Sequence, residues 1–164
     1  YKNLYDEEKE KLEYFLNNTS IWSLYELYIL VNVIDQIDVY LVKKIMEKLL
    51  EKRYKYILEL VQYRIIFIRI LIRAVLLLIR SGIEQESGEL LKTLSKICTS
   101  YDLSTRIAIK FLEACRNLFF SNKNTGESSI MKLLNLMRDL GAEELEYLAT
   151  TEFHKIQKVI KSRK

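Results

Sequence analysis

The sequence has no proline and only four glycines in 164 residues, whereas average composition would supply roughly eight prolines and about eleven glycines. Residues that interrupt helices are therefore rare along the chain. Hydrophobic residues make up 49% and charged residues 29% of the sequence, a balance typical of a globular domain and too apolar for a disordered one. These features predict an all-α fold of helices joined by short turns, with one domain over residues 1–164.

Residues that carry common catalytic chemistry are also scarce. The glycines are isolated from one another, so no Gly-rich nucleotide loop can form. The single histidine, His154, and the two distant cysteines, Cys98 and Cys115, exclude a two-histidine zinc site and a C-x-x-C motif. No nucleophile and base occur at a recognisable spacing. We therefore expect no metal, no cofactor and no enzymatic activity.

Two cysteines and the lack of a signal-peptide pattern predict a cytoplasmic protein. The net charge of +4 is below the clustered excess typical of a domain that binds DNA itself. The apolar stretch from Ile65 to Ile79 contains Arg69 and Arg73, and it is shorter than the roughly 20 residues that a membrane span needs. We expect it to be a core helix, with no membrane contact.

The spacing of apolar residues predicts about eight helices, over residues 6–16, 21–36, 39–53, 56–81, 84–98, 103–121, 127–140 and 142–161. Polar residues that favour N-caps precede three of them, and glycines follow two. The expected N-caps are Ser20, Asp38 and either Asp102 or Ser104, and the expected C-terminal glycines are Gly82 and Gly141. Residues 122–126 form the most loop-like stretch.

Pairing successive helices from the second to the seventh gives three antiparallel hairpins, as in a degenerate tetratricopeptide-like stack. The first helix of each hairpin would line the concave face, and each of these helices carries a polar stripe. The stripes could be ordinary solvated faces. Alternatively, their Asn, Arg and Tyr side chains suit an extended peptide, because amides bond the main chain and arginines hold carboxylates. The expected peptide-binding residues are Tyr25, Tyr28, Asn32, Arg69, Arg73 and Asn117, whereas Trp22 is expected in the core.

The last two predicted helices carry apolar residues that have two interpretations. Leu145, Leu148 and Phe153 could form a homodimer interface, or they could cover the end of the helical stack. Acids such as Glu26 and Asp35 are interpreted as helix-surface or capping residues.

Several segments resemble one family. Residues 21–32, IWSLYELYILVN, are similar to the W-x-x-Y-E-L-x-x-x-x-N signature of the Rgg/GadR/MutR transcriptional regulators of Gram-positive bacteria. Residues 12–16, LEYFL, residues 72–79, IRAVLLLI, and residues 137–145, MRDLGAEEL, resemble further family segments in the same order. The similarity covers nearly the whole chain and corresponds to the C-terminal regulatory region of those proteins.

The resemblance implies a right-handed tetratricopeptide-like superhelix that dimerises and receives short hydrophobic peptide pheromones on its concave side. It also implies an N-terminal helix-turn-helix domain that contacts DNA. Nothing here resembles that domain, and the first residue is Tyr1, so we expect it to be missing from this chain. Two positions depart from the family: Asp35 stands where an Arg is expected, and Arg73 where an Asn is expected.

Two functions are compatible with these observations. The chain could be a cytoplasmic sensing and dimerisation domain that binds a short peptide and controls an attached DNA-binding domain. It could instead be a helical adaptor or dimerisation scaffold that binds a protein partner and no small effector.

Overall fold

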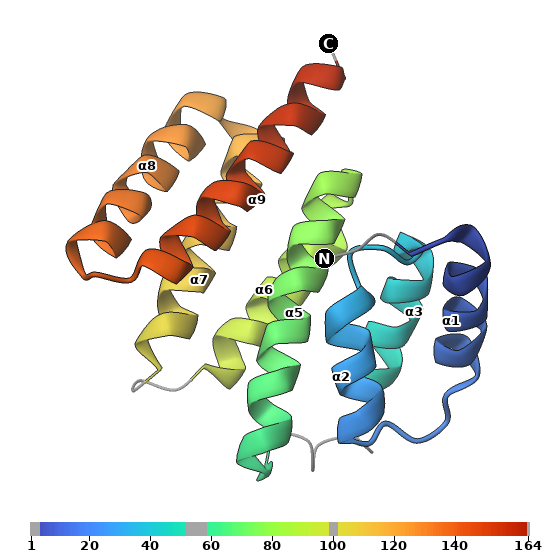
Figure 1. Ribbon diagram of the computed structural model, residues 1–164. Coiled ribbons are helices and arrows are strands. Elements are labelled where there is room, and N and C mark those ends of the chain that lie inside the picture. The colour runs from blue at the N-terminus through green and yellow to red at the C-terminus, as the bar shows by residue number, and fades with distance from the viewer. Residues whose placement is uncertain (1–3, 52–58, 99–101, 164) are drawn as a thin grey trace. The chain divides into compact units, whose positions relative to one another are not determined.

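A computed structural model describes residues 4–51, 59–98 and 102–163. Over these residues the chain forms eight α-helices and one π-helix and contains no strand (Figure 1). The all-α prediction is therefore confirmed. The chain divides into two compact units, Tyr1–Ala74 (unit 1) and Val75–Lys164 (unit 2). The superhelical arrangement of the hairpins stays a prediction.

Unit 1 contains α1 (Asp6–Asn18), α2 (Leu24–Val33), α3 (Val39–Leu50) and the first part of α5 (Val61–Ser81). α1 packs on α3, and lysines of α3 bond the end of α1: Lys44 Nζ lies 2.9 Å from Asn17 Oδ1, and Lys48 Nζ lies 3.2 Å from the Asn17 carbonyl. The core includes Leu16, Leu27, Leu30, Ile34, Val42, Ile45 and Met46. Trp22 is fully buried, as expected.

The N-caps of α2 and α3 show which polar side chains determine where these two helices begin. Asp38 caps α3 by accepting the Tyr40 N–H at 2.8 Å, as predicted. The expected cap of the second helix, Ser20, is wrong, because α2 is capped by Ser23. Ser23 accepts the Tyr25 N–H at 3.2 Å, and its own N–H donates to Glu26 Oε2 at 2.9 Å. This reciprocal capping box satisfies two donors together, so the helix begins later than predicted.

α5 is the apolar helix that the sequence placed in the core. Ten of its residues from Ile66 onwards are buried: Ile66, Phe67, Ile68, Ile70, Leu71, Ala74, Val75, Leu76, Leu78 and Ile79. Its first two turns differ, because Val61 is 57% and Ile65 is 50% exposed. None of the helices in the described parts of the chain has the length and apolar character needed to cross a membrane.

The predicted glycine at the end of α5 is confirmed. Gly82 has φ of +79°, and the Ile83 N–H bonds the Leu78 carbonyl at 2.9 Å, which closes a Schellman motif. Gly141 ends the region after α8 in the same way, with φ of +65°.

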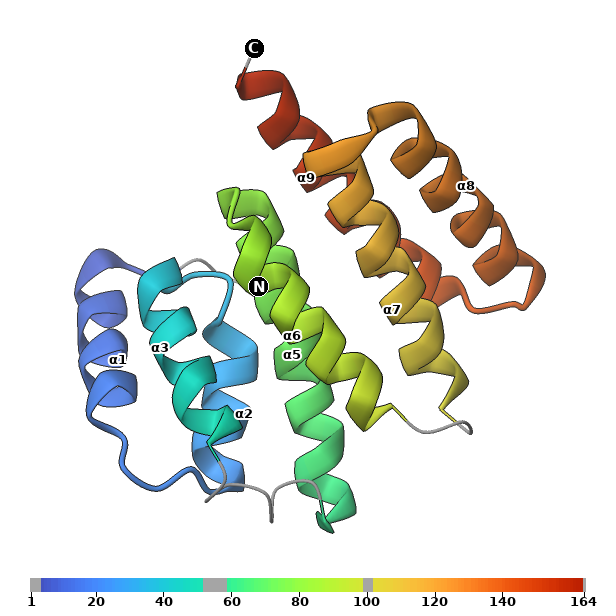
Figure 2. The same ribbon diagram turned by 180° about the vertical axis from the view of Figure 1, so that it is seen from behind.

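Unit 2 continues with α6 (Glu84–Ile97), α7 (Leu103–Arg116), α8 (Lys123–Asp139) and α9 (Glu143–Ser162), and each of these helices packs on the next (Figures 1 and 2). Asp102 caps α7 by accepting the Thr105 N–H at 2.9 Å, which settles the choice between Asp102 and Ser104. α7 continues directly into the π-helix η2 (Asn117–Ser121).

The loop expected at residues 122–126 is wrong. Asn122 is the N-cap of α8, and its side chain accepts the Thr125 N–H at 3.1 Å. Gly126 lies in the first turn of α8 and packs against η2, where a Cβ at this position would lie 2.3 Å from the Leu118 backbone nitrogen. Gly126, which contributed to the loop prediction, is needed because only a residue without a Cβ allows the two backbones to approach this closely.

Replacing Gly126 should therefore destabilise the fold more than replacing a glycine with open space around it. We expect Gly126→Ala to lower the free energy of unfolding by roughly 3 kcal/mol, because backbone atoms cannot move aside. Gly141→Ala is the matched control: nothing lies within 4 Å of its added Cβ, so only the left-handed conformation costs energy, roughly 1–2 kcal/mol. Urea unfolding followed by circular dichroism measures both, and an equal loss would contradict the packing role of Gly126.

Candidate functional site

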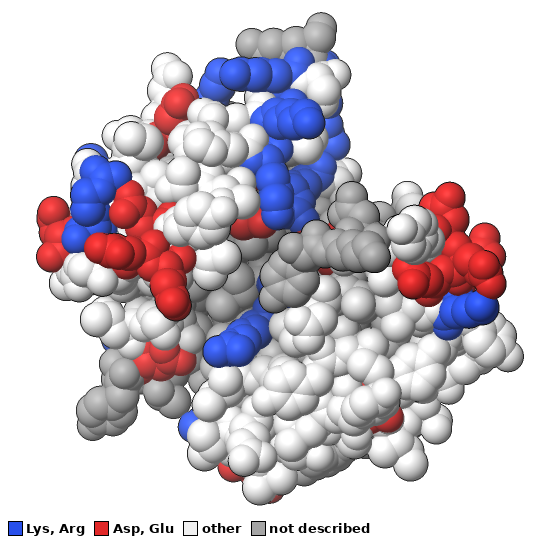
Figure 3. All heavy atoms as spheres, viewed as in Figure 1, with Lys and Arg blue, Asp and Glu red and all other residues white. Residues whose placement is uncertain are grey.

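Five of the six expected peptide-binding residues lie on two neighbouring helices of unit 1. α2 and the first part of α5 run side by side in both views (Figures 1 and 2). On α2, Tyr25 is 67% and Tyr28 is 54% exposed, and Asn32 is exposed on the same stripe. On α5, the exposed stripe consists of Val61, Ile65 and Arg69. We call these six residues the α2–α5 face; Figure 3 shows that the lower part of the molecule in this view carries few charged side chains.

A single arginine joins the two helices of this face. Arg73 of α5 donates from Nη2 to Asp35 Oδ2 at 2.6 Å and from Nε to the same oxygen at 3.0 Å. Its Nη1 donates to the carbonyl of Val31 near the end of α2. The Arg73 and Asp35 side chains are 29% and 22% exposed, so this pair is partly shielded from water. The guanidinium therefore fixes the end of α2 against the middle of α5.

Asn32 and Arg69 are the polar groups of the face that stay open to solvent. The Asn32 amide nitrogen donates to the Tyr28 carbonyl at 2.7 Å, which orients the side chain and leaves its carbonyl oxygen to accept a bond. Arg69 lies one helical turn before Arg73 and is exposed, and it has no hydrogen bond or ion pair within the described residues. The face thus combines aromatic and aliphatic surface with one acceptor and one cation.

The remaining expected residues are placed differently. Asn117 is exposed at the start of η2 in unit 2, so the structure does not group it with the five residues of unit 1. Glu26 acts as the capping acid of α2, as expected, and the hydrogen bond from Ser23 lowers the pKa of Glu26. Asp35 is an ion-pair partner rather than a cap.

The three residues considered for a dimer interface also differ from one another. Leu148 on α9 is 60% exposed, Leu145 is half-buried, and Phe153 is 5% exposed and packs in the core of unit 2. Phe153 therefore presents almost no surface to a partner. Exposed apolar side chains that the sequence reasoning missed are Tyr147, next to Leu148 on α9, with 73% exposure, and Leu140, directly after α8, with 55% exposure.

Metal-binding and thiol chemistry have little support in the described residues. Within them, no three His, Cys, Asp or Glu side chains come together to hold an ion. Cys115 is buried, and this burial raises the pKa of its thiol. Burial and the nearby Asp102 carboxylate also raise the pKa of Cys98.

The comparisons identify the family: residues 1–151 match the C-terminal domain of the helix-turn-helix-type transcriptional regulator Rgg, and the chain belongs to this family. No curated protein matches the chain in sequence.

A solved structure supports the fold. The crystal structure of a protein described as a transcriptional regulator from Listeria monocytogenes EGD-e is similar with a TM-score of 0.73 at 16% identity. The similarity covers 96% of this chain and 54% of that protein. This chain therefore spans about half the length of that regulator.

The Arg73–Asp35 contact can be measured by a double-mutant cycle with Arg73→Ala and Asp35→Ala. Because the pair is partly shielded and has two hydrogen bonds, we expect a coupling free energy of roughly 1–2 kcal/mol in urea unfolding. The control cycle uses Glu7 and Lys11 of α1, whose side chains are 79% and 75% exposed, and should give roughly 0.3 kcal/mol. Equal coupling in the two cycles would remove the proposed link between α2 and α5.

Proposed function

We propose that the chain is the sensing and dimerisation domain of a cytoplasmic transcriptional regulator, and that it binds a short apolar peptide on the α2–α5 face. The observation that carries the proposal is the exposed row of Tyr25, Tyr28, Val61 and Ile65 beside Asn32 and Arg69, in a member of the Rgg family. The DNA would be contacted by an attached N-terminal domain of the kind found in that family.

The chemistry of the face suits an extended peptide. Tyrosine rings offer large apolar surfaces with a polar tip and lose little conformational entropy when they bind. The Asn32 carbonyl oxygen can accept a main-chain N–H. The Arg69 guanidinium can hold a carboxylate through two parallel hydrogen bonds, and it has no competing acid within the described residues.

Asp35 and Arg73 are the two positions that depart from the family pattern, and their mutual ion pair accounts for both. Asp35 and Arg73 form an ion pair, so the Arg73 guanidinium is engaged within the domain and acts as a positioning residue between α2 and α5. The positive charge that faces a peptide on this surface is then Arg69. A peptide would change the regulator's output by binding one arrangement of the helices better than another, since equal affinity for both would shift nothing.

Peptide binding is tested by calorimetry with a pool of short hydrophobic peptides, including those encoded beside the gene for this chain. We expect Tyr28→Ala, Asn32→Ala and Arg69→Gln each to weaken binding about tenfold, which corresponds to about 1.4 kcal/mol. Tyr40→Ala is the matched control, because Tyr40 is 71% exposed on α3 and lies outside the face. If no peptide of the pool binds, or if Tyr28→Ala and Tyr40→Ala weaken binding equally, the proposal is overturned.

Dimerisation is assigned to the exposed apolar residues Leu140, Tyr147 and Leu148 of unit 2. Large apolar side chains exposed at neighbouring positions of the sequence support a contact with another protein. We expect the chain to sediment as a dimer and Leu148→Lys to raise the dissociation constant at least tenfold, because a buried ammonium would lose its hydration. Leu103→Lys is the control, since Leu103 is 62% exposed on α7. A monomeric wild-type chain would contradict this assignment.

A further inference from the structure

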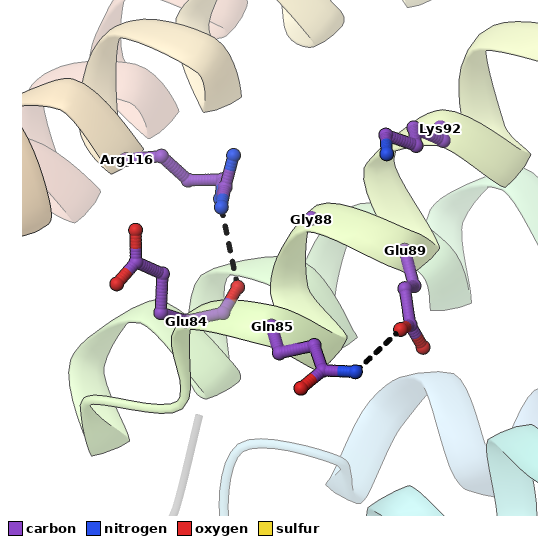
Figure 4. A pocket seen from close by; sticks show the side chains of 6 residues that line it. All are labelled: Glu84, Gln85, Gly88, Glu89, Lys92 and Arg116. Carbon is purple, nitrogen blue, oxygen red and sulfur yellow. Dashed lines mark hydrogen bonds between the residues drawn. The ribbon is translucent and has the colours of Figure 1, made fainter.

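A cavity of about 430 Å³ lies between α6 and α7 in unit 2. Its lining residues are Glu84, Gln85, Gly88, Glu89, Lys92 and Arg116 (Figure 4). The cavity shares no residue with the α2–α5 face, whose residues all belong to unit 1. Its most distinctive feature is an arginine that is fixed along one edge only.

Two hydrogen bonds hold the Arg116 guanidinium against α6. Its Nη2 donates to the Glu84 carbonyl at 3.2 Å (Figure 4). Its Nε donates to Ser87 Oγ at 3.1 Å. Ser87 is fully buried, and its hydroxyl donates to the Glu84 carbonyl at 2.7 Å. The hydroxyl that orients Arg116 is therefore itself fixed.

Gly88 creates the space that the guanidinium occupies. A Cβ at this position would lie 2.9 Å from Arg116 Nη2 and 3.2 Å from its Cζ. A glycine inside a helix is destabilising relative to alanine, and here it allows Arg116 to lie against the bare backbone of α6. The Nη1 group makes no hydrogen bond within the described residues, so one edge of a rigid fork is left for a ligand.

The remaining charged residues that line the cavity determine which charge of anion it can bind. The Lys92 amino group has no partner within the described residues, and it extends towards the Gly88 side of α6 in Figure 4. Glu89 accepts the Gln85 side-chain amide at 3.0 Å, and Figure 4 shows it turned away from Arg116. The two cations and two acids among the lining residues balance formally, so the site has no net positive charge to favour a dianion over a monoanion.

We infer that this cavity binds a carboxylate group, held by the free edge of Arg116 and by Lys92. A planar guanidinium matches the two oxygens of a carboxylate, and a guanidinium that is already fixed loses little freedom on binding. The carboxylate could belong to a small organic acid or to the C-terminus of a peptide. Both sources share this chemistry, and the experiment separates them.

The test is an NMR titration of the ¹⁵N-labelled chain, followed at the Gly88 amide and the Arg116 Nε–H. The probe is N-acetyl-leucine, and N-acetyl-leucinamide, which lacks the negative charge, is its matched control. We expect saturable shifts with N-acetyl-leucine in the millimolar range and none with the amide. Inorganic phosphate should bind more weakly than the carboxylate. Equal binding of acid and amide, or tighter binding of phosphate, would overturn the assignment.

Variants locate the site. Arg116→Lys keeps the charge but loses the fork, and Gly88→Ala displaces the guanidinium, so each should weaken binding at least tenfold. Arg106→Lys, on an exposed arginine of α7, and Tyr28→Ala should leave the affinity unchanged. Circular dichroism checks that each variant is folded, and Lys92→Gln, at an exposed position, gives a severalfold loss without any change to packing. Unchanged affinity in Arg116→Lys and Lys92→Gln would overturn the site.

A short apolar peptide with a free or amidated C-terminus distinguishes the two sources of carboxylate. Binding at least tenfold tighter than that of N-acetyl-leucine, and lost on amidation, assigns the cavity to a peptide end. Equal affinity of peptide and N-acetyl-leucine assigns it to small organic acids. Because Tyr28 variants report on the α2–α5 face and Arg116 variants report on the cavity, failure of one proposal is distinguishable from failure of the other.

Discussion

The guanidinium of Arg73 is the contact on which the arrangement of α2 and α5 depends. A charged group inside an apolar helix is costly unless it is paired and hydrogen-bonded, and Arg73 meets this need with Asp35 and the Val31 carbonyl. The Val31 carbonyl lies near the C-terminus of α2, where a cation is favoured by the helix dipole. The same pair that makes the arginine tolerable therefore aligns the two helices that carry Tyr25, Tyr28 and Ile65.

The same solution recurs in unit 2. Arg80, in the last turn of α5, is 13% exposed and pairs with Glu152 of α9, which is 17% exposed and also accepts Lys155. α5 thus carries two arginines seven residues apart, and each one pairs with an acid of its own unit. Apolar burial alone does not discriminate between neighbouring positions of a helix, whereas an ion pair that must find its partner does. The charges inside this helix specify how it packs.

Local chemistry explains which parts of the fold were predictable. Asp38, Asp102, Gly82 and Gly141 act within one turn of their own positions, so the sequence was sufficient to predict their roles. Ser20 and Ser23 could each cap the start of α2. Glu26, three residues after Ser23, completes a capping box with Ser23, so the helix begins there and not after the predicted cap, Ser20. Residues 122–126 were predicted as a loop because their composition favours one, yet the packing of α8 against η2 is a tertiary requirement that composition does not contain.

The candidate sites show the same division between local pattern and tertiary partner. The stripes on α2 and α5 follow from helical spacing, and the sequence identified Tyr25, Tyr28, Asn32 and Arg69 as exposed polar or aromatic positions. It could not reveal that Arg73 is engaged by Asp35, because the two residues are 38 positions apart. The cavity on α6 was missed altogether, although a glycine inside an otherwise helical segment, Gly88, was a usable signal of close approach.

An arginine can serve a ligand only to the extent that the fold has left its hydrogen-bonding edge free. Arg73 uses all three guanidinium nitrogens on the Val31 carbonyl and on Asp35, which lies just after α2, so it shapes the face without offering itself to a peptide. Arg69 is exposed and unrestrained, and it must lose side-chain freedom when it binds, a cost of about 0.5–1.5 kcal/mol. Arg116 is intermediate, with one edge fixed by Ser87 and Glu84 and the other open. On this physical basis the carboxylate site proposed beside Gly88 would gain more from each hydrogen bond to an anion than Arg69 would. A peptide bound as proposed on the α2–α5 face would then draw its affinity mainly from aromatic and aliphatic contacts.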